Sequence, residues 1–575
     1  MPTSARTPNA PRSIASARDG DKPRRRLCPG AAEQSADTCG YIAHVNESQH
    51  GTDSPALRGD PKRSPARVVY SLVLFHVALW TLVPLAVNRN LPLDTIEALA
   101  WGHEWQWGYD KHPPLSAWLP EIAAIVGFRT DLGLYLLSQV FVAITLLTVY
   151  RLAREILREA LGGESDADAA AMVATLVLEG IFYFNYTTPE FNVNVIQMPL
   201  WALGAFFFWR ATRTGSLGAW AGLGVCAALA ALSKYLGLVM LAPMAAYAIW
   251  SPHRRKIFGS AGPYLAAAVC LLMLTPHLLW MSQHEFKTLT YGLRRAAAGE
   301  VTALKRVTEP LKLAAGQATI TGGAVVLFLF ARPVRRGKGN DEPASHGSAR
   351  QARLFALMMA AGPVLTLVAV SLTTGMRIRT MWAAPMLSMT GVALAAHFPL
   401  TATARQLKQF TWIVLGMLCF SAVMYGGVAS WGDRQSSDHR TNFPGPRLAA
   451  AITSQWHDRY AAPLPIVIGD EWYAGSVAWY SPDRPRVFLD GDPERSPWLD
   501  DESVRRHGAV IVWVAVDEQG RRTALNEAFP NDLSKRFEIA DTLVFNVDWR
   551  PREGSQNVVL HAALVPPAGK AARPK

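Results

Sequence analysis

The chain has 575 residues with a formal net charge of +12, and half of its residues are hydrophobic while only 18% are charged. A soluble chain would carry about 25% charged residues, so the composition excludes an ordinary soluble protein and indicates an integral membrane protein. The positive charge would suggest nucleic-acid binding in a soluble protein, but here the basic residues gather in the amino-terminal tail and in alternate loops, so no nucleic-acid partner is expected.

The amino-terminal tail, residues 1–66, is rich in Pro, Ser, Ala and Arg and lacks apolar periodicity, which predicts disorder. No apolar stretch lies near Met1, so we expect no cleavable signal peptide. The basic run "DPKRSPAR" leads directly into the first apolar segment and predicts that the tail is cytoplasmic. The five cysteines lie in the tail and in apolar segments, and their spacing supports neither a disulfide framework nor a metal site.

Apolar residues then recur in blocks of roughly 17 to 22, the length with which a helix crosses a hydrocarbon core ~30 Å thick. The blocks predict about 11 transmembrane helices, near residues 68–87, 132–151, 169–184, 195–209, 217–233, 235–250, 262–281, 313–331, 353–372, 382–398 and 410–428. Basic residues gather in every second connecting loop, and the positive-inside rule assigns those loops to the cytoplasm. Because the number of crossings is odd, we expect the region after about residue 430 on the outer side.

The carboxyl-terminal region, residues 430–575, has a different pattern. The short apolar runs "LPIVIGD", "RVFLD" and "GAVIVWVAV" have strand character. They alternate with "EWYAGSVAWY" and "LDDESVRRHG", which can form helices, and we expect Asp470 to cap the first of these helices. The alternation predicts a small α/β domain, which follows a polytopic α-helical transmembrane domain at 67–429 and lies on the outer side.

Four loops on the predicted outer side contain most of the unusual charged residues. The first loop is residues 88–131, the second is "NYTTPEFNVN", the third is about 282–312 and the fourth is "TTGMRIRT". Their charged residues and histidines include Asp94, Glu97, Asp110, Lys111, His112, Glu190, His284, Glu285, Arg294, Arg295, Lys305, Arg306, Arg377 and Arg379. Basic residues on the outer side run against the orientation rule, so we expect these cations to bind an anion at the membrane surface.

The first loop contains two acids that are suited to catalysis. Its stretch "LDTIEALAWGHEW" predicts an amphipathic helix on the membrane, with Asp94 and Glu97 on one face at i and i+3. A carboxylate at the mouth of a membrane cavity can take a proton from a sugar or lipid hydroxyl. Lys111, beside a Pro-Pro turn, can hold a phosphate as a compact charge. The same D-x-x-E spacing is also a capping box, in which Asp94 caps the helix and Glu97 reaches back.

The aromatic residues of the first loop have two interpretations. Their rings suit either stacking on sugars or anchoring at the membrane interface. They are Trp101, Trp105, Trp107 and Tyr109. His112 is suited to the phosphate site, although a lone histidine is also typical of a hydrogen-bonded surface position. Lys234, between two apolar segments, is expected to extend its amine toward the membrane surface.

Several stretches together resemble bacterial membrane glycosyltransferases of family 39. They are "LPLDTIEALAWGHEWQWGYDKHPPLSAW", "YTTPEFN", "ALSKYLGLVMLAP", "RTMWAAPMLSMTGV" and "GDEWYAGSVAWYSPDRPRVFLDGD". More broadly, they resemble the superfamily of protein mannosyltransferases and of aminoarabinose and galacturonic acid transferases of lipid A. The resemblance covers about residues 68–515 and implies a GT-C fold. It also implies transfer of a sugar from a polyprenyl-phosphate donor to a lipid A, glycan or protein acceptor at the outer face of the bacterial inner membrane.

The resemblance also implies roles for individual residues. Asp94 matches the family's catalytic base, and we expect an inverting transfer because one base suffices without a covalent nucleophile. Many relatives have an adjacent second acid, whereas the next acid here is Glu97. Lys111 matches the phosphate-contacting lysine, although His112 separates it from the prolines. The residues expected to assist with the donor phosphate and sugar are Glu190, Arg294, Arg295, Arg377 and Arg379.

A divalent metal is a further expectation from the resemblance. In the lipid A relatives an acid just before the lysine can join a histidine of a later loop around a metal, which corresponds to Asp110 and His284 here. Two rival functions remain. A transporter or flippase for a polyprenyl-linked glycan predicts charged residues within the spans and two related halves. A non-catalytic envelope scaffold leaves the outer cations unexplained. The sequence does not distinguish the sugar, the acceptor or the oligomeric state.

Overall fold

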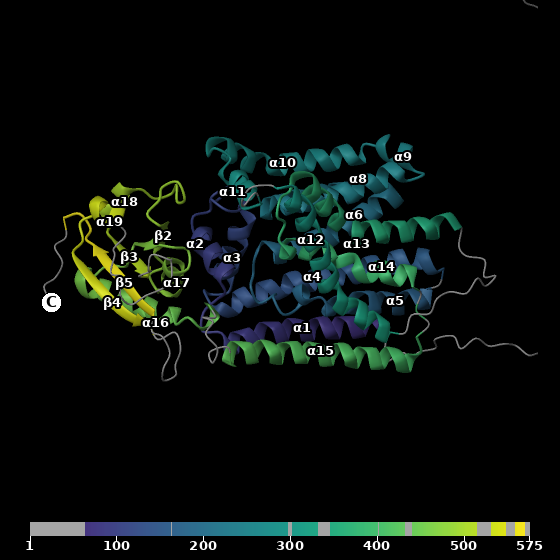
Figure 1. Ribbon diagram of the computed structural model, residues 1–575, viewed down its shortest axis with the longest axis horizontal. Helices are drawn as coiled ribbons and strands as arrows, with labels where there is room; N and C mark the ends of the chain where they lie inside the picture. The colour runs from purple at the N-terminus through teal and green to yellow at the C-terminus, as the bar shows by residue number, and fades with distance from the viewer. Residues whose placement is uncertain are drawn as a thin grey trace, which may run out of the picture. The chain divides into compact units, whose positions relative to one another are not determined.

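The computed structural model describes residues 64–162, 164–296, 302–331, 346–398, 400, 402–431, 440–514, 531–547 and 558–569. All of them belong to one compact unit, Leu57–Lys575. The predicted amino-terminal tail lies outside the described residues up to residue 63. The described chain is mostly helical and ends in one five-stranded sheet (Figure 1).

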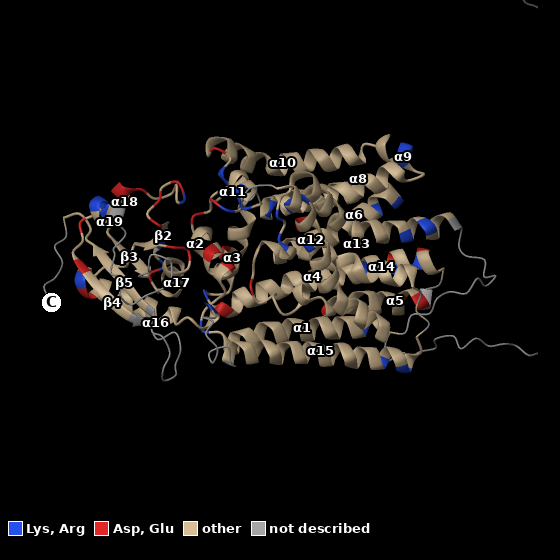
Figure 2. Cartoon of the chain, viewed as in Figure 1, with Lys and Arg blue, Asp and Glu red and all other residues tan. Residues whose placement is uncertain are grey.

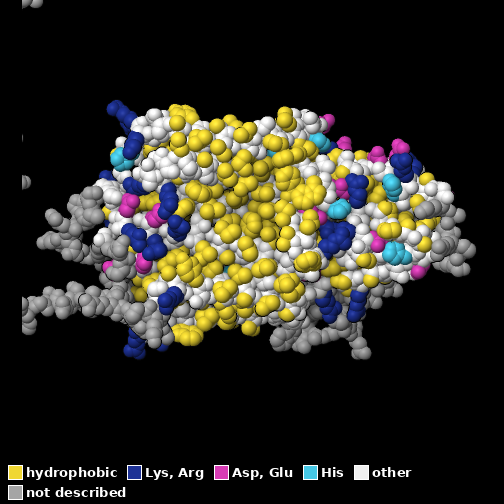
Figure 3. Space-filling view, turned by 180° about the vertical axis from the view of Figure 1, so that it is seen from behind, with side chains coloured by type: hydrophobic (Ala, Val, Ile, Leu, Met, Phe, Trp, Pro, Cys, Tyr) yellow, Lys and Arg dark blue, Asp and Glu magenta, His cyan; other side chains and the backbone are white. Residues whose placement is uncertain are grey.

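Six helices among the described residues are long and apolar enough to cross a membrane. They are α1 Pro65–Val87, α4 Asp131–Leu161, α10 Gly262–Gln283, α12 Ala303–Phe330, α13 His346–Thr374 and α15 Ala404–Trp431. Figure 3 shows a band of hydrophobic side chains across the middle of one face, with charged side chains toward both ends. The chain is therefore a multi-pass membrane protein, as its composition predicts.

The other five predicted crossings correspond to shorter, broken or less apolar helices. These elements are α5 Glu164–Leu176 with the 3₁₀ turns η1 Val177–Gly180 and η2 Phe182–Phe184, α6 Val193–Thr214, α7 Leu217–Ser233, η3 Tyr235–Met240 with α8 Leu241–Trp250, and η4 Thr380–Met389 with α14 Thr390–His397. Prolines account for two of the breaks, because Pro243 and Pro385 have no N–H to donate to the preceding turn. The crossing number of about 11 stays a prediction.

Two short helices, α2 Leu93–Gly102 and α3 Leu115–Val126, form the first loop between α1 and α4. The predicted surface helix begins where expected but ends at Gly102. A Cβ at Gly102 would lie 2.5 Å from the carbonyl oxygen of Ala117, so only glycine allows α2 and α3 to approach this closely.

The carboxyl-terminal sheet has the strand order β2-β1-β3-β5-β4. Its strands are β1 Ile466–Gly469, β2 Arg486–Leu489, β3 Ala509–Val514, β4 Asp541–Val547 and β5 Val558–Val565. Strand β1 is parallel to β2 and β3, whereas β5 is antiparallel to β3 and β4. The three predicted apolar runs are β1, β2 and β3, so their strand assignment is confirmed.

Helices flank this sheet and connect its parallel strands, which cannot be joined by tight turns. Helix α17 Tyr473–Tyr480 joins β1 to β2, and α18 Asp501–His507 joins β2 to β3, as the sequence predicts. The remaining short helices are α9 Arg254–Phe258, α11 Lys287–Ala296, η6 Arg440–Asn442, α16 Gly445–Tyr460 and α19 Asn531–Arg536.

One face of the sheet shares a hydrophobic core with the first loop. Because side chains alternate along a strand, Val467 and Val510 face one side of the sheet while Ile468 faces the other. The side with Val467 packs in the same cluster as Ile96 and Trp101 of α2. The sheet region therefore holds the first loop in position against the helices.

The helical body, defined here as α1, α4 to α8, α10 and α12 to α15, has a different charge pattern at its two ends. Figure 2 shows basic residues at the end far from the sheet, at α9 and at the neighbouring ends of α13 and α15. Residues of both signs gather near α2 and α3 at the end that faces the sheet. This distribution agrees with the alternation of basic loops in the sequence.

Candidate active site

Asp94 and Glu97 of the first loop lie on α2, about one helical turn apart. Neither side chain caps this helix. The N-cap residue of α2 is Pro92, and no side chain of the cap accepts a hydrogen bond, so the capping-box interpretation of Asp94 is wrong. Instead, the backbone N–H of Asp94 donates to Oε1 of Glu190 at 3.1 Å. Glu190 of the second loop thus supplies an oxygen acceptor for one of the N–H groups that a helix start leaves without an intrahelical partner.

Asp94 and Glu190 are neighbouring, half-buried carboxyl groups that interact electrostatically. Burial raises the pKa of Asp94, while the charges of Lys234, Lys111 and Arg440 favour its ionised form. Burial also raises the pKa of Glu190, and the negative charge of Asp94 raises it further. Because the cations gather around Asp94, it is the member of the pair that is suited to carry the charge.

Lys111 joins the first loop to the segment that follows β1. Its Nζ lies 2.5 Å from Oε1 of Glu97 and also donates to Glu471. Burial raises the pKa of Glu97 to about 8, although Lys111 opposes the effect. Burial alone would raise the pKa of Glu471 as well, but Lys111 and Arg495 hold it at about 2. Glu471 is therefore the carboxylate that neutralises Lys111.

Arg495 extends this cluster of charges toward the surface. Its guanidinium donates to Glu471 at 3.1 Å, lies 3.5 Å from Asp110 and pairs with Asp490. Sequence reasoning missed both Glu471 and Arg495. Glu471 lies inside the "GDEWYAG" stretch, where only Asp470 was considered. Asp470 accepts from the backbone N–H groups of Trp472 and Tyr473, at 3.1 and 2.6 Å, and so holds the turn that leads into α17, although the N-cap residue of that helix is Trp472.

Lys234 has polar and aromatic contacts near the first loop. Its Nζ donates to Oδ1 of Asn194 at 3.2 Å and lies 4.8 Å from the ring centre of Trp382. From there its charge acts on Asp94, and Arg379 lies near enough to act on Lys234. Lys234 directly follows α7, and these contacts hold its amine beside the site.

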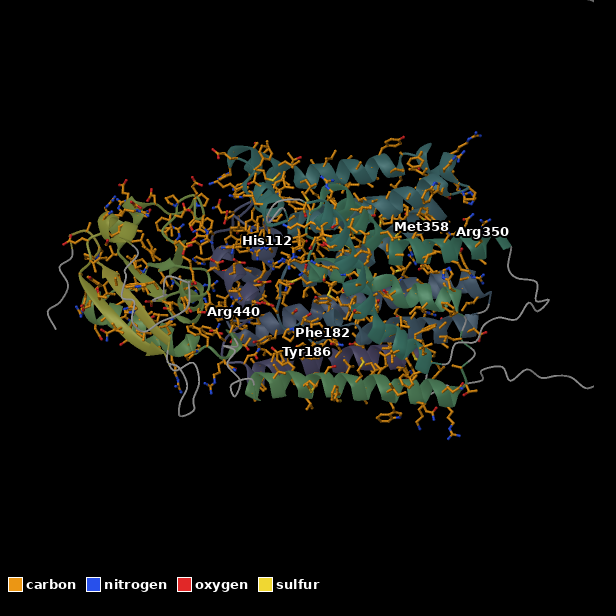
Figure 4. All side chains as sticks on the ribbon, in the orientation of Figure 1. His112, Phe182, Tyr186, Arg350, Met358 and Arg440 are labelled. Atoms are coloured by element: carbon orange, nitrogen blue, oxygen red, sulfur yellow. The ribbon has the colours of Figure 1, made fainter. Side chains whose placement is uncertain are left out.

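His112 and Arg440 lie toward the end of the helical body that faces the sheet, whereas Arg350 lies at the opposite end (Figure 4). Burial lowers the pKa of His112 to about 3, and the nearby charges of Lys234 and Lys111 lower it further. His112 is half-buried. Its backbone oxygen accepts from the N–H of Tyr109 at 3.1 Å and closes the turn that carries Lys111.

The four aromatic residues of the first loop fall into two groups. Trp101 and Tyr109 are each 1% exposed and stack on one another with ring centres 5.6 Å apart, so their rings belong to the core. Trp105 and Trp107 are 45% and 40% exposed and pack around Trp118. Only the exposed pair can meet a sugar or the membrane interface.

The predicted cations of the third and fourth loops are spread more widely. Arg294 lines an open cleft of about 710 Å³ between α11 and the segment after β2. The other lining residues are Asp110, Glu285, Lys287, Thr290, Leu293, Asp492, Glu494 and Arg495. Arg295 is exposed, and Arg377 is exposed with its Nε 4.0 Å from Glu309. A cleft of this size can hold a sugar-sized ligand.

The predicted metal ligands have other contacts. Asp110 pairs with Arg495, and His284 donates from Nδ1 to the carbonyl oxygen of Trp280 at 2.8 Å. The His284 ring also stacks on Trp280, with centres 4.2 Å apart. Within the described ranges, no group of three or more His, Cys, Asp or Glu residues is arranged to hold a metal ion. The predicted pair thus gains no third protein ligand there.

Comparisons with known proteins agree with the arrangement. Residues 111–280 match the family described as dolichyl-phosphate-mannose-protein mannosyltransferases. The chain is 24% identical over 478 residues to the lipopolysaccharide core galacturonosyltransferase RgtB of Rhizobium johnstonii, covering 81% of this chain and 90% of RgtB. The structure of ArnT from Cupriavidus metallidurans bound to undecaprenyl phosphate superposes with a TM-score of 0.54 at 13% identity, over 86% of this chain and 97% of ArnT. These matches confirm the resemblance and the GT-C fold.

Proposed function

This chain is a membrane glycosyltransferase of the GT-C fold, and we propose that it transfers a sugar from a polyprenyl-phosphate donor to a hydroxyl of a lipid, glycan or protein acceptor. The proposal rests mainly on one observation: the half-buried Asp94 carboxyl in the first turn of α2 lies where the charges of Lys234, Lys111 and Arg440 favour its ionised form. ArnT is a protein of the same fold that binds undecaprenyl phosphate, which supports a donor of this class.

In the proposed mechanism Asp94 is the general base. It takes the proton of the acceptor hydroxyl as that oxygen forms a bond to the anomeric carbon of the donor. The bond from the anomeric carbon to the phosphate oxygen breaks, and polyprenyl phosphate leaves from the opposite face. The configuration at the anomeric carbon is inverted, because a single displacement occurs.

Lys111 stabilises the charge that develops on the leaving phosphate. A phosphate oxygen takes the position of one carboxylate oxygen at Nζ, which Glu97 and Glu471 occupy in the ligand-free protein. Glu97, with its raised pKa, is the partner that can be neutral near pH 7 and release Lys111. Glu190 orients the donor sugar and holds the start of α2.

The remaining cations and aromatics contact the donor at its periphery. Arg294 supports the sugar or phosphate from the open cleft, next to Asp110. Arg295, Arg377 and Arg379 contact phosphate groups of the donor or of membrane lipids. His112 shapes the phosphate site in its neutral form, and the exposed Trp105 and Trp107 stack on a sugar or anchor the loop.

The proposed topology follows the charge pattern of the loops. The tail at 1–66 is cytoplasmic, the domain at 67–429 crosses the bacterial inner membrane about 11 times, and the domain at 430–575 lies in the periplasm. Some helices are too short or too weakly apolar to count as spans by themselves. In the proposed topology these helices complete the crossings inside the bundle. The sheet domain covers the first loop and limits access of water to Asp94.

The test uses purified protein in nanodiscs with a panel of polyprenyl-phosphate sugars and a membrane extract as acceptor source. RgtB is named as a galacturonosyltransferase of the lipopolysaccharide core, so the galacturonic acid donor is tested first. Wild type should release polyprenyl phosphate, and Asp94→Asn should not. The control is Asp168→Asn, which removes a carboxylate that pairs with Arg154. Release from no donor, or full release by Asp94→Asn, would favour the flippase or scaffold alternatives.

A further inference from the structure

A buried ionisable pair lies inside the helical body, apart from the residues assigned above. His76 on α1 and Glu179 in η1 are 0% and 2% exposed, and Nδ1 of His76 lies 3.0 Å from Oε1 of Glu179. An ionisable pair inside a membrane bundle is costly and is usually retained for function. Sequence reasoning missed the pair because the two residues are 103 positions apart.

Hydrogen bonds connect this pair to the second loop. Nε2 of His76 lies 3.2 Å from Oε1 of Gln139 on α4, and Nε2 of Gln139 donates to Oγ1 of Thr188 at 3.2 Å. The Thr188 hydroxyl in turn donates to the carbonyl oxygen of Asn185 at 2.6 Å. Both ring nitrogens of His76 thus face oxygen atoms, and each is satisfied when it carries a proton.

The turn that receives these bonds carries Glu190. The side chain of Asn185 donates to the backbone oxygen of Glu179. Glu179 therefore contacts both the turn and His76. The N–H of Thr188 donates to Asn185 at 3.0 Å. Glu190, the last residue of this turn, accepts from the backbone N–H of Asp94. A continuous series of contacts therefore runs from the middle of α1 to the candidate base.

Aromatic packing holds the same turn from its other side. Tyr186 packs against Trp80 of α1 and Tyr425 of α15, with ring centres 6.4 and 5.4 Å apart. It also stacks on Phe182, and Figure 4 shows both residues beside α1. This packing fixes where the turn lies but does not orient Thr188, whose hydroxyl and carbonyl groups are held by the polar residues of α4.

We propose that His76, Glu179, Gln139 and Thr188 are positioning residues, which hold the Asn185–Glu190 turn so that Glu190 fixes the first turn of α2 and aims Asp94. The inference rests on the proposed function of Asp94. Apolar side chains would fill the same space without a desolvation cost, so filling space does not account for this network. A fully bonded polar network allows one arrangement of the turn, which is what alignment of a base requires.

The first test measures backbone hydrogen exchange by mass spectrometry, and it does not depend on activity. Thr188→Val removes the hydroxyl link, and Thr145→Val is the matched control, since Thr145 is equally buried but donates only to Phe141 of its own helix. Exchange of the Asp94 amide and of residues 185–192 should rise about fivefold or more in Thr188→Val. The control should match wild type. Unchanged exchange in Thr188→Val would overturn the proposal.

The second test measures transfer kinetics. Thr188→Val should lower kcat about tenfold with little change in the donor KM, and Thr188→Ser should restore it. In a Glu190→Gln background, the same change should add little, because the network acts through Glu190. If the two substitutions lowered kcat independently, so that their fold-losses multiplied in the double variant, the network would act by a route other than Glu190. If wild type transfers no sugar, the proposed function fails, while the exchange result still decides whether the network holds the turn.

Discussion

Lys111 of the first loop donates a hydrogen bond to Glu471, which lies 360 positions later in the chain. Lys111 also binds Glu97, so one ammonium group joins α2 to the segment that follows β1. A lysine that is assigned to phosphate binding is thus held by two carboxylates before any donor arrives. Through this contact the sheet region contributes one residue, Glu471, to the candidate site.

Replacing Lys111 by Met should lower the rate of transfer about 100-fold, because the charge on the leaving phosphate loses its main stabilising contact. The release of polyprenyl phosphate measures this rate. Lys312→Met is the control, since Lys312 is exposed and its ion pair is with Glu309 on its own helix. Equal losses in both variants would point to a general effect of lost charge and would contradict the assigned role.

The sheet region and the first loop are also joined by a buried ion pair. Nη2 of Arg484 lies 2.6 Å from Oε2 of Glu121 on α3, and both side chains are nearly inaccessible. Glu121→Ala leaves a buried guanidinium without its partner, which should lower the free energy of unfolding by about 3 kcal/mol. Thermal unfolding should therefore begin at a lower temperature. Arg505→Met, at an exposed pair with Asp501, should change it little.

Local patterns in the sequence predicted much of the architecture. The apolar blocks, the first three strands and the start of α2 follow from residue periodicity, which depends only on near neighbours. The breaks at η3 and η4 were missed, although Pro243 and Pro385 are a signal for them. Hydropathy averaged over a window of residues is unaffected by the loss of one backbone hydrogen-bond donor, so it does not predict these breaks.

Partners across long separations could not be predicted from the sequence. Glu471, Lys234 and Glu179 acquire their contacts only when helices and strands pack, and no spacing rule relates such positions. The roles of His76 on α1 and Gln139 on α4 could not be predicted, because each residue lies among apolar residues in a segment that is predicted as a span. The contact of Asp94 with Glu190, from another loop, could likewise not be predicted from the sequence.

The close approach of α2 and α3 gives a further prediction. In Gly102→Ala, the new Cβ would lie 2.5 Å from the Ala117 oxygen and 2.9 Å from Cβ of Glu121, so the helices must separate. We expect a loss of about 2 kcal/mol in stability and a marked fall in kcat, because Asp94 and Glu97 move with α2. Gly292→Ala on α11 is the control, because no atom of the described residues lies within 4 Å of its added Cβ. Retained kcat in Gly102→Ala would show that the helix contact does not align the acids.

The raised pKa of Glu97 predicts how stability depends on pH. Burial raises this pKa from 4.5 in the unfolded chain to about 8 in the folded protein. Between these values the folded state binds more protons than the unfolded state, so the free energy of unfolding falls as the pH rises. The contribution of Glu97 is complete below pH 4.5 and is lost as the pH passes about 8. In Glu97→Gln, which cannot ionise, the unfolding temperature should therefore fall less between pH 5 and 8 than in wild type. Glu494→Gln, at an 84% exposed side chain, should follow the wild-type profile. Parallel profiles for wild type and Glu97→Gln would mean that Glu97 is already ionised at pH 5, with Lys111 outweighing the effect of burial.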